Sequence, residues 1–231
     1  MTAALADEIT SADAFARQFS VSSETIEKLE TYAAKLRTWQ KAVNLVAPKT
    51  LDSVWHRHFA DSAQLLPLIP DSATTLADLG SGAGFPGLVI AILATEQRPD
   101  LSVTLVESDT RKAAFLSDVA RAVENPCRIL STRIEASSTV AALGSVDCVT
   151  ARALASSSQL LAYLAPIAHA STVGIFPKGR TFARELADAK EAWDFDLALV
   201  PSLTDAESRI AVISHLRSRR QEGPNAHDNS G

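Results

Sequence analysis

A glycine-rich turn is the feature of this sequence that most constrains its fold. The run Thr75–Leu79 is mostly apolar, and Gly80, Gly82 and Gly84 follow it at alternate positions before a second apolar run begins. Glycine tolerates positive φ and lets a ligand approach the backbone closely. A strand that turns through glycines into a helix is typical of open parallel sheets, which bind ligands at the carboxyl ends of their strands. The sequence therefore predicts a strand, a turn and a helix at a ligand site.

The rest of the chain repeats this alternation of apolar runs and helical periods. We expect strands near residues 75–79, 101–107, 127–130, 145–151 and 171–176, with helices between them. Such alternation predicts an α/β fold with a doubly wound, mostly parallel sheet. The last two apolar runs, 195–200 and 209–214, have no helix between them, which predicts an antiparallel hairpin and a sheet of seven strands.

Residues 1–70 are expected to form an N-terminal helical extension. Ser23 is a good helix cap, and apolar residues recur at helical spacing from Ile26 as far as Val43. A second helix is expected over 51–66, because the prolines that follow it end the helical pattern.

Composition and length limit the remaining organisation. With 231 residues, of which 46% are hydrophobic, the chain can bury one full core, which we place at 71–216. The stretch after Leu216 offers few apolar side chains, so 217–231 is expected to be a disordered tail. The formal charge of -5 argues against a protein that is basic all over, although a local basic patch could still bind nucleic acid.

The sequence gives no sign of a membrane span, a metal site or a disulfide scaffold. Cys127 and Cys148 are the only cysteines, and their spacing does not suit zinc. The apolar run 88–94 is far shorter than the ~20 residues that cross a bilayer. The N-terminal residues lack the basic and apolar parts of a signal peptide. We therefore expect a cytoplasmic protein that binds no metal.

Two cofactors fit the glycine turn. Residues 82–87 match the G-x-G-x-x-G pattern of dinucleotide sites, with Glu107 placed to bind a ribose, as in a nicotinamide-dependent oxidoreductase. Asp78 argues for a different ligand, because a carboxylate beside a pyrophosphate in a partly dry cleft costs on the order of several kcal/mol. S-adenosylmethionine instead brings an ammonium and a sulfonium, which a carboxylate attracts. The sequence thus favours S-adenosylmethionine, and Glu107 can bind ribose hydroxyls in either case.

The region after the fourth expected strand limits the acceptor. Residues 147–154 contain neither an Asn/Asp-Pro-Pro-aromatic clamp nor a cysteine nucleophile motif, and the segment 125–127, Asn-Pro-Cys, lies before the third strand. An acceptor with a free lone pair, such as guanine N7, needs positioning and no base. Arg152 could hold the carboxylate of the cofactor or a phosphate. A non-catalytic RNA-binding module on the same fold remains a third hypothesis.

Several segments together resemble the glucose-inhibited division protein B family. Its members are bacterial methyltransferases that modify N7 of a guanine in 16S ribosomal RNA. The resemblance spans roughly residues 25–215, and its parts before the glycine turn are the most specific. The matching segments are 39–45, 57–62, 78–87, 111–116, 133–135, 152–153 and 178–179.

The resemblance implies roles for particular residues. It implies catalytic roles for Asn44, His58, Arg133 and Lys178. Together with the glycine turn, it implies cofactor contacts at Asp78, Gly80, Ser81, Gly82, Gly84, Phe85, Glu107, Ile134, Glu135 and Arg152. RNA contacts are expected from Lys41, Arg57, Arg111 and Lys112. The implied partner is 16S ribosomal RNA or the small ribosomal subunit, bound by a monomer. Gln40 departs from the family pattern, which usually has Asn there, so a role for that amide is in doubt.

Overall fold

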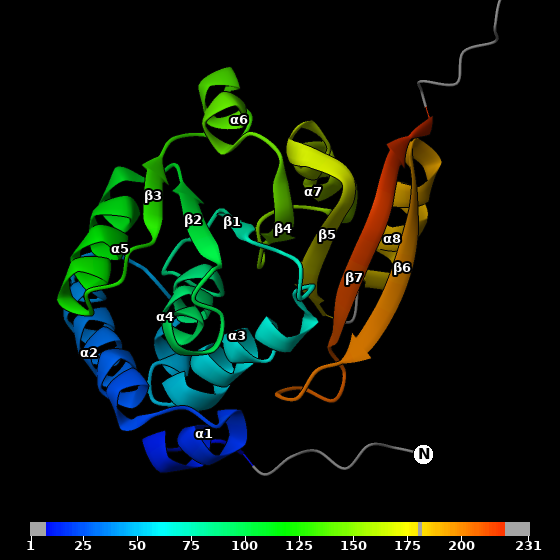
Figure 1. The fold of residues 1–231 in the computed structure, drawn as a ribbon. Coiled ribbons are helices and arrows are strands. Elements are labelled where there is room, and N and C mark those ends of the chain that lie inside the picture. The colour runs from blue at the N-terminus through cyan, green and yellow to red at the C-terminus, as the bar shows by residue number, and fades with distance from the viewer. Residues whose placement is uncertain (1–7, 180–181, 220–231) are drawn as a thin grey trace, which may run out of the picture.

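A single seven-stranded sheet forms the centre of the molecule (Figure 1). The computed structural model describes residues 8–179 and 182–219. Its strands are ordered β3-β2-β1-β4-β5-β7-β6. The first five are parallel, and β7 runs antiparallel to both β5 and β6, so the expected doubly wound sheet with a C-terminal hairpin is confirmed. The strands are β1 Thr75–Leu79, β2 Ser102–Glu107, β3 Arg128–Ser131, β4 Val146–Thr150, β5 Ala168–Lys178, β6 Trp193–Pro201 and β7 Arg209–Ser218.

Helices cover both faces of the sheet (Figure 1). They are α1 Ala12–Phe19, α2 Ser23–Trp39, α3 Asp61–Ala63, α4 Gly87–Gln97, α5 Thr110–Ala122, α6 Ser137–Leu143, α7 Ser157–Leu164 and α8 Phe182–Ala192. Short 3-10 turns lie at Pro48–Thr50, Leu66–Leu68 and Ala165–Ile167, and a π-helical segment, Trp55–Ala60, leads into α3. Within the described ranges, no helix is both long enough and apolar enough to cross a membrane.

Alternation along the strands divides the hydrophobic core into two layers. In β1, Leu76 belongs to the larger hydrophobic cluster, whereas Ala77 and Leu79 belong to the smaller one. Successive strand side chains point to opposite faces, so Asp78 shares the face of Leu76. The larger cluster contains side chains of α1, α2, α4 and α5, and the smaller one contains side chains of α7 and α8.

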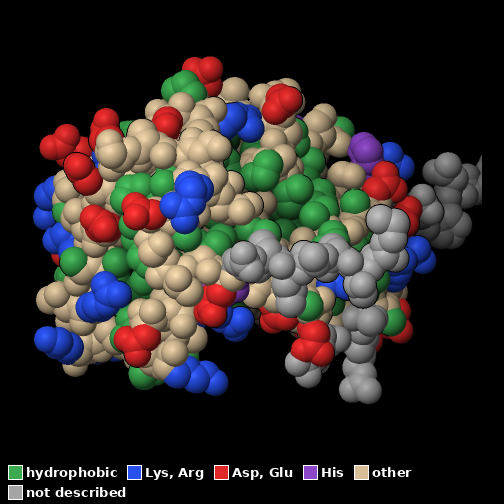
Figure 2. Space-filling view, turned by 90° about the horizontal axis from the view of Figure 1, so that it is seen from below, with side chains coloured by type: hydrophobic (Ala, Val, Ile, Leu, Met, Phe, Trp, Pro, Cys, Tyr) green, Lys and Arg blue, Asp and Glu red, His purple; other side chains and the backbone are tan. Residues whose placement is uncertain are grey.

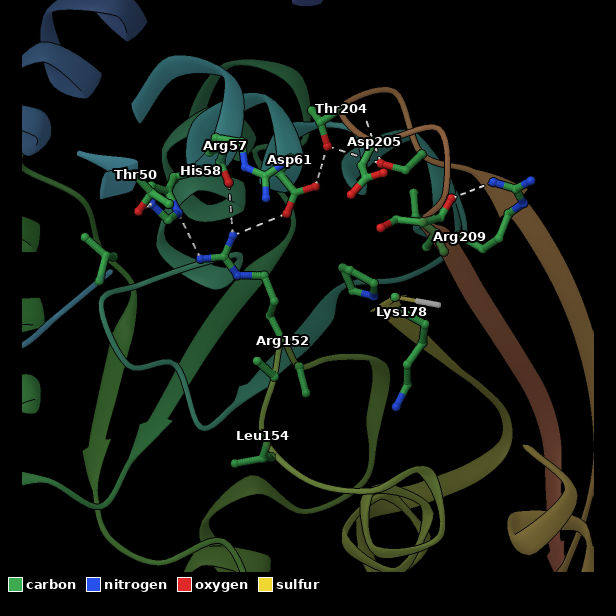
Figure 3. Close-up of a pocket in the computed structure, with 18 of the residues that line it drawn as sticks. Thr50, Arg57, His58, Asp61, Arg152, Leu154, Lys178, Thr204, Asp205 and Arg209 are labelled. Carbon is green, nitrogen blue, oxygen red and sulfur yellow. Dashed lines mark hydrogen bonds and ion pairs between the residues drawn. The ribbon is translucent and has the colours of Figure 1, made fainter. Parts of the chain in front are cut away.

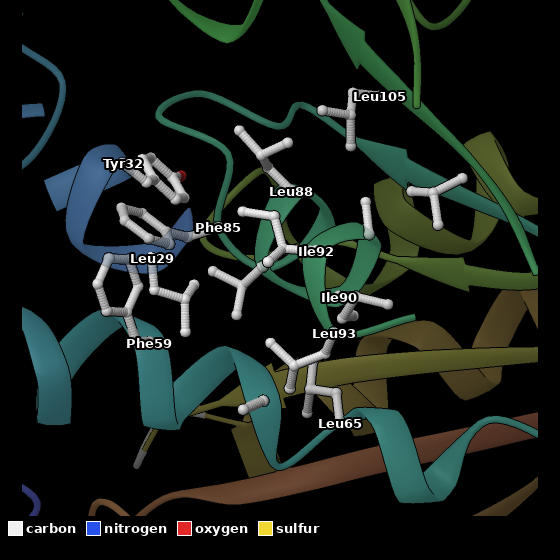
Figure 4. Close-up of a cluster of buried hydrophobic side chains, with 14 of the residues drawn as sticks. Leu29, Tyr32, Phe59, Leu65, Phe85, Leu88, Ile90, Ile92, Leu93 and Leu105 are labelled. Atoms are coloured by element: carbon white, nitrogen blue, oxygen red, sulfur yellow. The ribbon is translucent and has the colours of Figure 1, made fainter. Parts of the chain in front are cut away.

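Helix α4 lies at the centre of the larger cluster (Figure 4). All residues from Gly87 to Ala94 are buried, which explains why this apolar run has no polar face. Leu29 and Tyr32 of α2 pack in the same cluster as Leu88 of α4. The described part of the expected 1–70 extension therefore shares its core with the sheet.

The first long helix ends earlier than expected. It stops at Trp39, so Val43 lies outside it. The Gln40 side chain stabilises the loop that follows. Its Oε1 accepts hydrogen bonds from Leu45 N and Val46 N, both at 3.0 Å, and its Nε2 donates to Val46 O at 2.9 Å. The amide whose role was in doubt therefore braces the loop after α2.

The helix expected over 51–66 is not continuous. It contains the π-helical segment Trp55–Ala60 and the short α3, and Ser62 Oγ donates a hydrogen bond to His58 O at 2.7 Å where the two meet. A π turn holds one extra residue and occurs often at functional sites. Helix α1 was not predicted.

Strands β5 and β7 are longer than expected. β5 begins at Ala168, and β7 continues to Ser218, where Arg217 pairs with Asp194 of β6. The first two residues of the expected tail therefore belong to a strand, because backbone pairing does not require apolar side chains. Residues 220–231, which make up most of that expected tail, lie outside the described residues.

Candidate active site

The glycine turn lies at the carboxyl end of β1. Gly80 and Gly84 have φ values of +66° and +91°, which L side chains rarely adopt. A Cβ at Gly80 would overlap Leu154 Cδ1, and one at Gly84 would overlap the Tyr32 hydroxyl. Tyr32 also donates a hydrogen bond to Ala83 O. The turn is thus wedged between α2 and the segment that follows β4.

Glu107, at the end of β2, fixes the turn from the other side. Its buried carboxylate accepts a hydrogen bond from Gly82 N at 2.8 Å through Oε2 and one from Asp109 N at 2.7 Å through Oε1. Hydrogen bonds to an ionised carboxylate are stronger than neutral ones. The position of Glu107 is therefore set by backbone groups of two turns.

The turn opens onto a cleft of about 370 Å³, which we call the glycine-turn cleft. This volume lies within the range of small-molecule sites, about 300–1,000 Å³. The opposite wall comes from the segment between β3 and α6 and from the residues after β4. The lining residues are Gly80, Gly82, Val106, Glu107, Ser108, Lys112, Arg133, Ile134, Glu135, Arg152, Ala153, Leu154 and Tyr163.

Asp78 does not line this cleft, contrary to the premise of the sequence argument. It is fully buried on the α4 side of β1. Its Oδ1 accepts a hydrogen bond from Thr150 Oγ1 at 2.8 Å, whereas Oδ2 has no hydrogen-bond partner in the part of the chain that the structure describes. Burial raises the pKa of Asp78 to about 6, against the opposing effect of the Ser81 and Thr150 hydroxyls. Its place is beneath the turn.

A second cleft, of about 500 Å³, lies beside the first (Figure 3). We call it the hairpin cleft, because the turn between β6 and β7 forms one of its walls. Its other walls come from residues 45–61, from the end of β5 and from the segment after β4. Arg152, Ala153 and Leu154 line both clefts, so the two cavities meet at this segment.

His58 is a buried, neutral imidazole in the wall of the hairpin cleft. Its Nδ1 accepts a hydrogen bond from Arg152 Nη2 at 3.2 Å, and its Nε2 lies 2.8 Å from Thr50 Oγ1. Thr50 donates its own hydroxyl hydrogen to Ala47 O, so Nε2 carries the ring proton. Burial lowers the pKa of His58 to about 3, and Arg152 and Arg57 act in the same direction. Both ring nitrogens are engaged.

Arg152, directly after β4, forms the partition between the two clefts. Its Nη1 donates to Asp61 Oδ2 at 3.2 Å and to Arg57 O at 3.4 Å, and its Cζ lies 5.1 Å from the Phe85 ring centroid. With the bond to His58, these contacts engage most of the guanidinium. The expected contact between Arg152 and a cofactor carboxylate stays a prediction.

Lys178, at the end of β5, lines the hairpin cleft. Its Nζ lies 3.2 Å from Glu185 Oε2 and 5.7 Å from the Phe182 ring centroid. The side chain is only 11% exposed, so these two contacts, and not solvent, fix the position of its ammonium group.

The remaining expected residues divide between the clefts and the rest of the molecule. Lys112, Arg133, Ile134 and Glu135 line the glycine-turn cleft, and Arg57 lines the hairpin cleft. Seven expected residues line neither of these two clefts: Lys41, Asn44, Asp78, Ser81, Gly84, Phe85 and Arg111.

Phe85 and Asn44 lie outside both clefts for different reasons, because Phe85 is buried and Asn44 is exposed. Phe85 is buried between the rings of Tyr32 and His58, with centroid distances of 5.4 and 4.6 Å. Asn44 is exposed in the loop after α2, where its Oδ1 accepts a hydrogen bond from Gln40 Nε2 at 3.4 Å. Phe85 therefore supports the wall that His58 forms, and Asn44 belongs to the braced loop.

Sequence reasoning missed Asp61 and Thr204, which both line the hairpin cleft. Asp61 lies within the 57–62 segment, whose Arg-His-x-x-Asp pattern was a usable signal. Thr204 had no local signal, because its partner Asp61 is 143 positions away in the sequence.

Charged side chains of both signs are interspersed around a hydrophobic centre on the face that Figure 2 shows. On α2, Lys28 pairs with Glu24 at 2.7 Å and Lys35 pairs with Asp118 of α5 at 2.9 Å. These ion pairs partly neutralise the basic face of this helix.

Solved structures that share this fold include methyltransferases. A predicted O-methyltransferase from Agrobacterium tumefaciens gives a TM-score of 0.53 over 68% of this chain and 82% of its own, at 20% identity. Magnesium protoporphyrin IX methyltransferase from Synechocystis PCC 6803, solved with bound SAM, gives 0.54 over 84% and 98%, at 12% identity. At these identities the likeness shows the fold alone. The sheet, with a glycine turn after β1 and an acidic residue at the end of β2, has the Rossmann-like α/β fold that these enzymes share.

Sequence comparison identifies the family within this class. The family described as "GidB: rRNA small subunit methyltransferase G" matches residues 25–211. Ribosomal RNA small subunit methyltransferase G of Methylorubrum extorquens (strain PA1) is 49% identical over 196 residues, 85% of this chain and 91% of the relative. The protein of the same name from Parvibaculum lavamentivorans is 44% identical over 90% of this chain and 91% of its own. The chain belongs to this family, which confirms the resemblance and favours a methyltransferase over an oxidoreductase.

Proposed function

We propose that this protein transfers a methyl group from S-adenosylmethionine to N7 of a guanine in 16S ribosomal RNA. The observation that carries the proposal is the meeting of the two clefts at residues 152–154. A donor in the glycine-turn cleft and an acceptor base in the hairpin cleft would face each other across this segment. Membership of the rRNA small subunit methyltransferase G family supports the choice of substrate.

The residues of the glycine-turn cleft fit S-adenosylmethionine. Gly80 lines this cleft with a positive φ of +66°, a backbone conformation that brings the chain close to a ligand without a side chain in between. Glu107 presents a fixed carboxylate at the end of β2, where a ribose would bind. Ile134 and Glu135 supply the facing wall. When bound, S-adenosylmethionine supplies an electrophilic methyl carbon.

The protein contributes to the reaction by aligning guanine N7 with the methyl carbon of the donor. Guanine N7 carries a free lone pair, so no proton has to leave before attack. His58 suits this chemistry, because both its ring nitrogens are engaged and its pKa of about 3 keeps it neutral at physiological pH. It acts as a wall and not as a base. Holding two reactants in line can be worth an effective molarity of about 10⁵ M or more.

Cationic groups around the hairpin cleft suit an RNA substrate. Arg57, Lys178 and Arg209 line this cleft, and Arg133 stands 79% exposed at the rim of the other. Contacts to phosphates position a nucleic acid, and contacts to base edges select it. Because one chain supplies the lining of both clefts, we propose that the protein acts as a monomer. We also propose that it works in the cytoplasm, where a ribosomal RNA substrate would be met.

The test is methyl transfer with purified components. The protein is incubated with S-adenosylmethionine carrying a tritiated methyl group and with either 16S ribosomal RNA or small ribosomal subunits, and the RNA is then digested to nucleosides. We expect the label to co-elute with 7-methylguanosine. Label in another nucleoside contradicts the N7 assignment. No label with RNA in any assembly state would favour a non-catalytic RNA-binding role.

A further inference from the structure

Asp61 joins three separate segments at the partition between the clefts, and the proposed chemistry does not use it. Its Oδ2 lies 3.2 Å from Arg152 Nη1. Its Oδ1 accepts hydrogen bonds from Thr204 Oγ1 at 2.6 Å and from Gln64 Nε2 at 3.1 Å. The Asp61 side chain is only 20% exposed. One carboxylate thus ties α3 to the segment after β4 and to the turn between β6 and β7 (Figure 3).

Further hydrogen bonds dock the β6–β7 turn on the same helical segment. Gln64 Oε1 accepts a hydrogen bond from Leu203 N at 2.7 Å, and Gln64 Nε2 donates to Ser202 Oγ at 3.3 Å. The His56 ring lies 3.1 Å from Thr204 O through Nε2. This turn is one wall of the hairpin cleft, so its position sets the width of the cleft.

Arg152 forms the facing wall, and Asp61 is its ion-pair partner. The other contacts of the guanidinium are neutral: the Arg57 carbonyl, the His58 ring and the Phe85 face. Because the Arg152 side chain is only 22% exposed, its positive charge is poorly solvated by water and depends on the Asp61 carboxylate. Loss of the Asp61 carboxylate would therefore release Arg152 from its place and free the β6–β7 turn at the same time.

We propose that Asp61 is a positioning residue for methyl transfer. It acts by holding the side chains of Arg152 and Thr204 at fixed positions in the walls of the hairpin cleft. This inference rests on the proposed function. Asp61 fixes the two walls between which the acceptor base is aligned with the methyl donor. A misplacement of about 1 Å can lower a rate by about 10²-fold, so a small shift of these walls has a large effect on turnover.

The first test compares Asp61→Asn with Asp118→Asn. Asp118 is a matched control, because it also ties two segments, through Lys35 Nζ and Trp39 Nε1, both at 2.9 Å, and it lines neither cleft. We expect Asp61→Asn to lower kcat on ribosomal RNA by about 10- to 100-fold, with the Kd for S-adenosylhomocysteine within about threefold of wild type. We expect Asp118→Asn to lower thermal stability without changing kcat.

Two variants of Thr204 distinguish the effect of its hydroxyl hydrogen bond on kcat from the effect of its side-chain packing. Thr204→Val removes the donor to Asp61 Oδ1 while keeping the shape, and Thr204→Ser keeps the donor. We expect Thr204→Val to reduce kcat in the same direction as Asp61→Asn, and Thr204→Ser to restore it. Equal kcat values for the two variants, or a kcat for Asp61→Asn equal to that of Asp118→Asn, overturn the proposal.

Amide hydrogen exchange tests, without any methyl transfer, whether Asp61 holds the β6–β7 turn in place. We expect Asp61→Asn, and not Asp118→Asn, to speed exchange at Leu203 and Thr204. Unchanged exchange at these amides overturns the proposal even if the enzyme is active. If the wild-type protein labels no RNA, the proposed function fails, and faster exchange in Asp61→Asn still shows that the carboxylate holds the turn.

Discussion

The two clefts are built by different means, although they meet at the same three residues. Backbone groups dominate the glycine-turn cleft: glycines with positive φ form its floor, and Glu107 is held by the amides of Gly82 and Asp109. Side chains from distant segments dominate the hairpin cleft, where Asp61 bonds to Arg152 and Thr204. The first cleft depends on a short stretch of sequence and the second on the whole fold.

This difference suits the two tasks that we propose. A cofactor shared by many enzymes can be held by a local backbone motif that tolerates changes elsewhere. An acceptor in a particular RNA needs a shape assembled from several loops. Changes in the first cleft should therefore alter cofactor affinity, and changes in the second should alter turnover or RNA affinity alone.

The largest effect is expected from Gly80→Ala. The new Cβ would need φ near +66° and would overlap Leu154 Cδ1, so we expect the affinity for S-adenosylhomocysteine to fall about 100-fold. Calorimetric titration measures it. Gly144→Ala is the control, because Gly144 also has a positive φ, +62°, yet no atom lies within 4 Å of its Cβ position. If both variants bind alike, the backbone conformation at Gly80 and its packing against Leu154 are not needed for cofactor binding.

A smaller effect is expected from pH, and two buried side chains, His58 in the wall of the hairpin cleft and Asp78 beneath the glycine turn, should respond with opposite signs. The folded pKa of His58, about 3, lies below its usual 6.5, so its contribution to stability is present above pH 6.5 and is lost as pH falls. The folded pKa of Asp78, about 6, lies above its usual 3.8, so stability is gained as pH falls through 6. Between pH 7 and 5, linkage gives a loss of about 2 kcal/mol from His58 and a gain of about 1 kcal/mol from Asp78.

Chemical denaturation of two variants separates these contributions. Relative to wild type, His58→Gln should gain stability on going from pH 7 to 5, and Asp78→Asn should lose it. The sign of each difference is the result that matters. A His58→Gln variant whose stability follows the wild-type curve between these pH values would mean that His58 titrates normally in the folded protein.

The smallest of the three effects is expected from Lys178→Ala. Loss of one nearly buried cation from the hairpin cleft should lower kcat/KM for RNA about tenfold, since a hydrogen bond to a charged group is worth about 1.5 kcal/mol or more. The Kd for S-adenosylhomocysteine should stay at its wild-type value. A parallel loss of cofactor affinity would show that the two clefts do not act separately.

Local sequence was enough to predict the elements around the first cleft. The bounds of β1 and the position of the glycine turn follow from an apolar run and closely spaced glycines, and the structure confirms both. The mostly parallel sheet and the C-terminal hairpin followed from the same alternation. Each of these features depends on neighbours within a few residues.

Features that depend on distant partners were not predictable. The side of β1 to which Asp78 points is decided by its contact with α4, and this removes the charge argument that selected the cofactor from sequence. Family membership now supports that choice. Two local features were missed for another reason: the π turn before α3 and the Gln40 brace arise from hydrogen bonds between a side chain and nearby backbone, which apolar periodicity does not reveal.

The most direct test of the central claim is to map 7-methylguanosine in 16S ribosomal RNA from cells with and without this protein. We predict one guanine that carries the N7 methyl group only when the protein is present, and whose methylation is restored by the wild-type chain but not by Gly80→Ala. An unchanged pattern of 7-methylguanosine in cells that lack the protein would contradict the account.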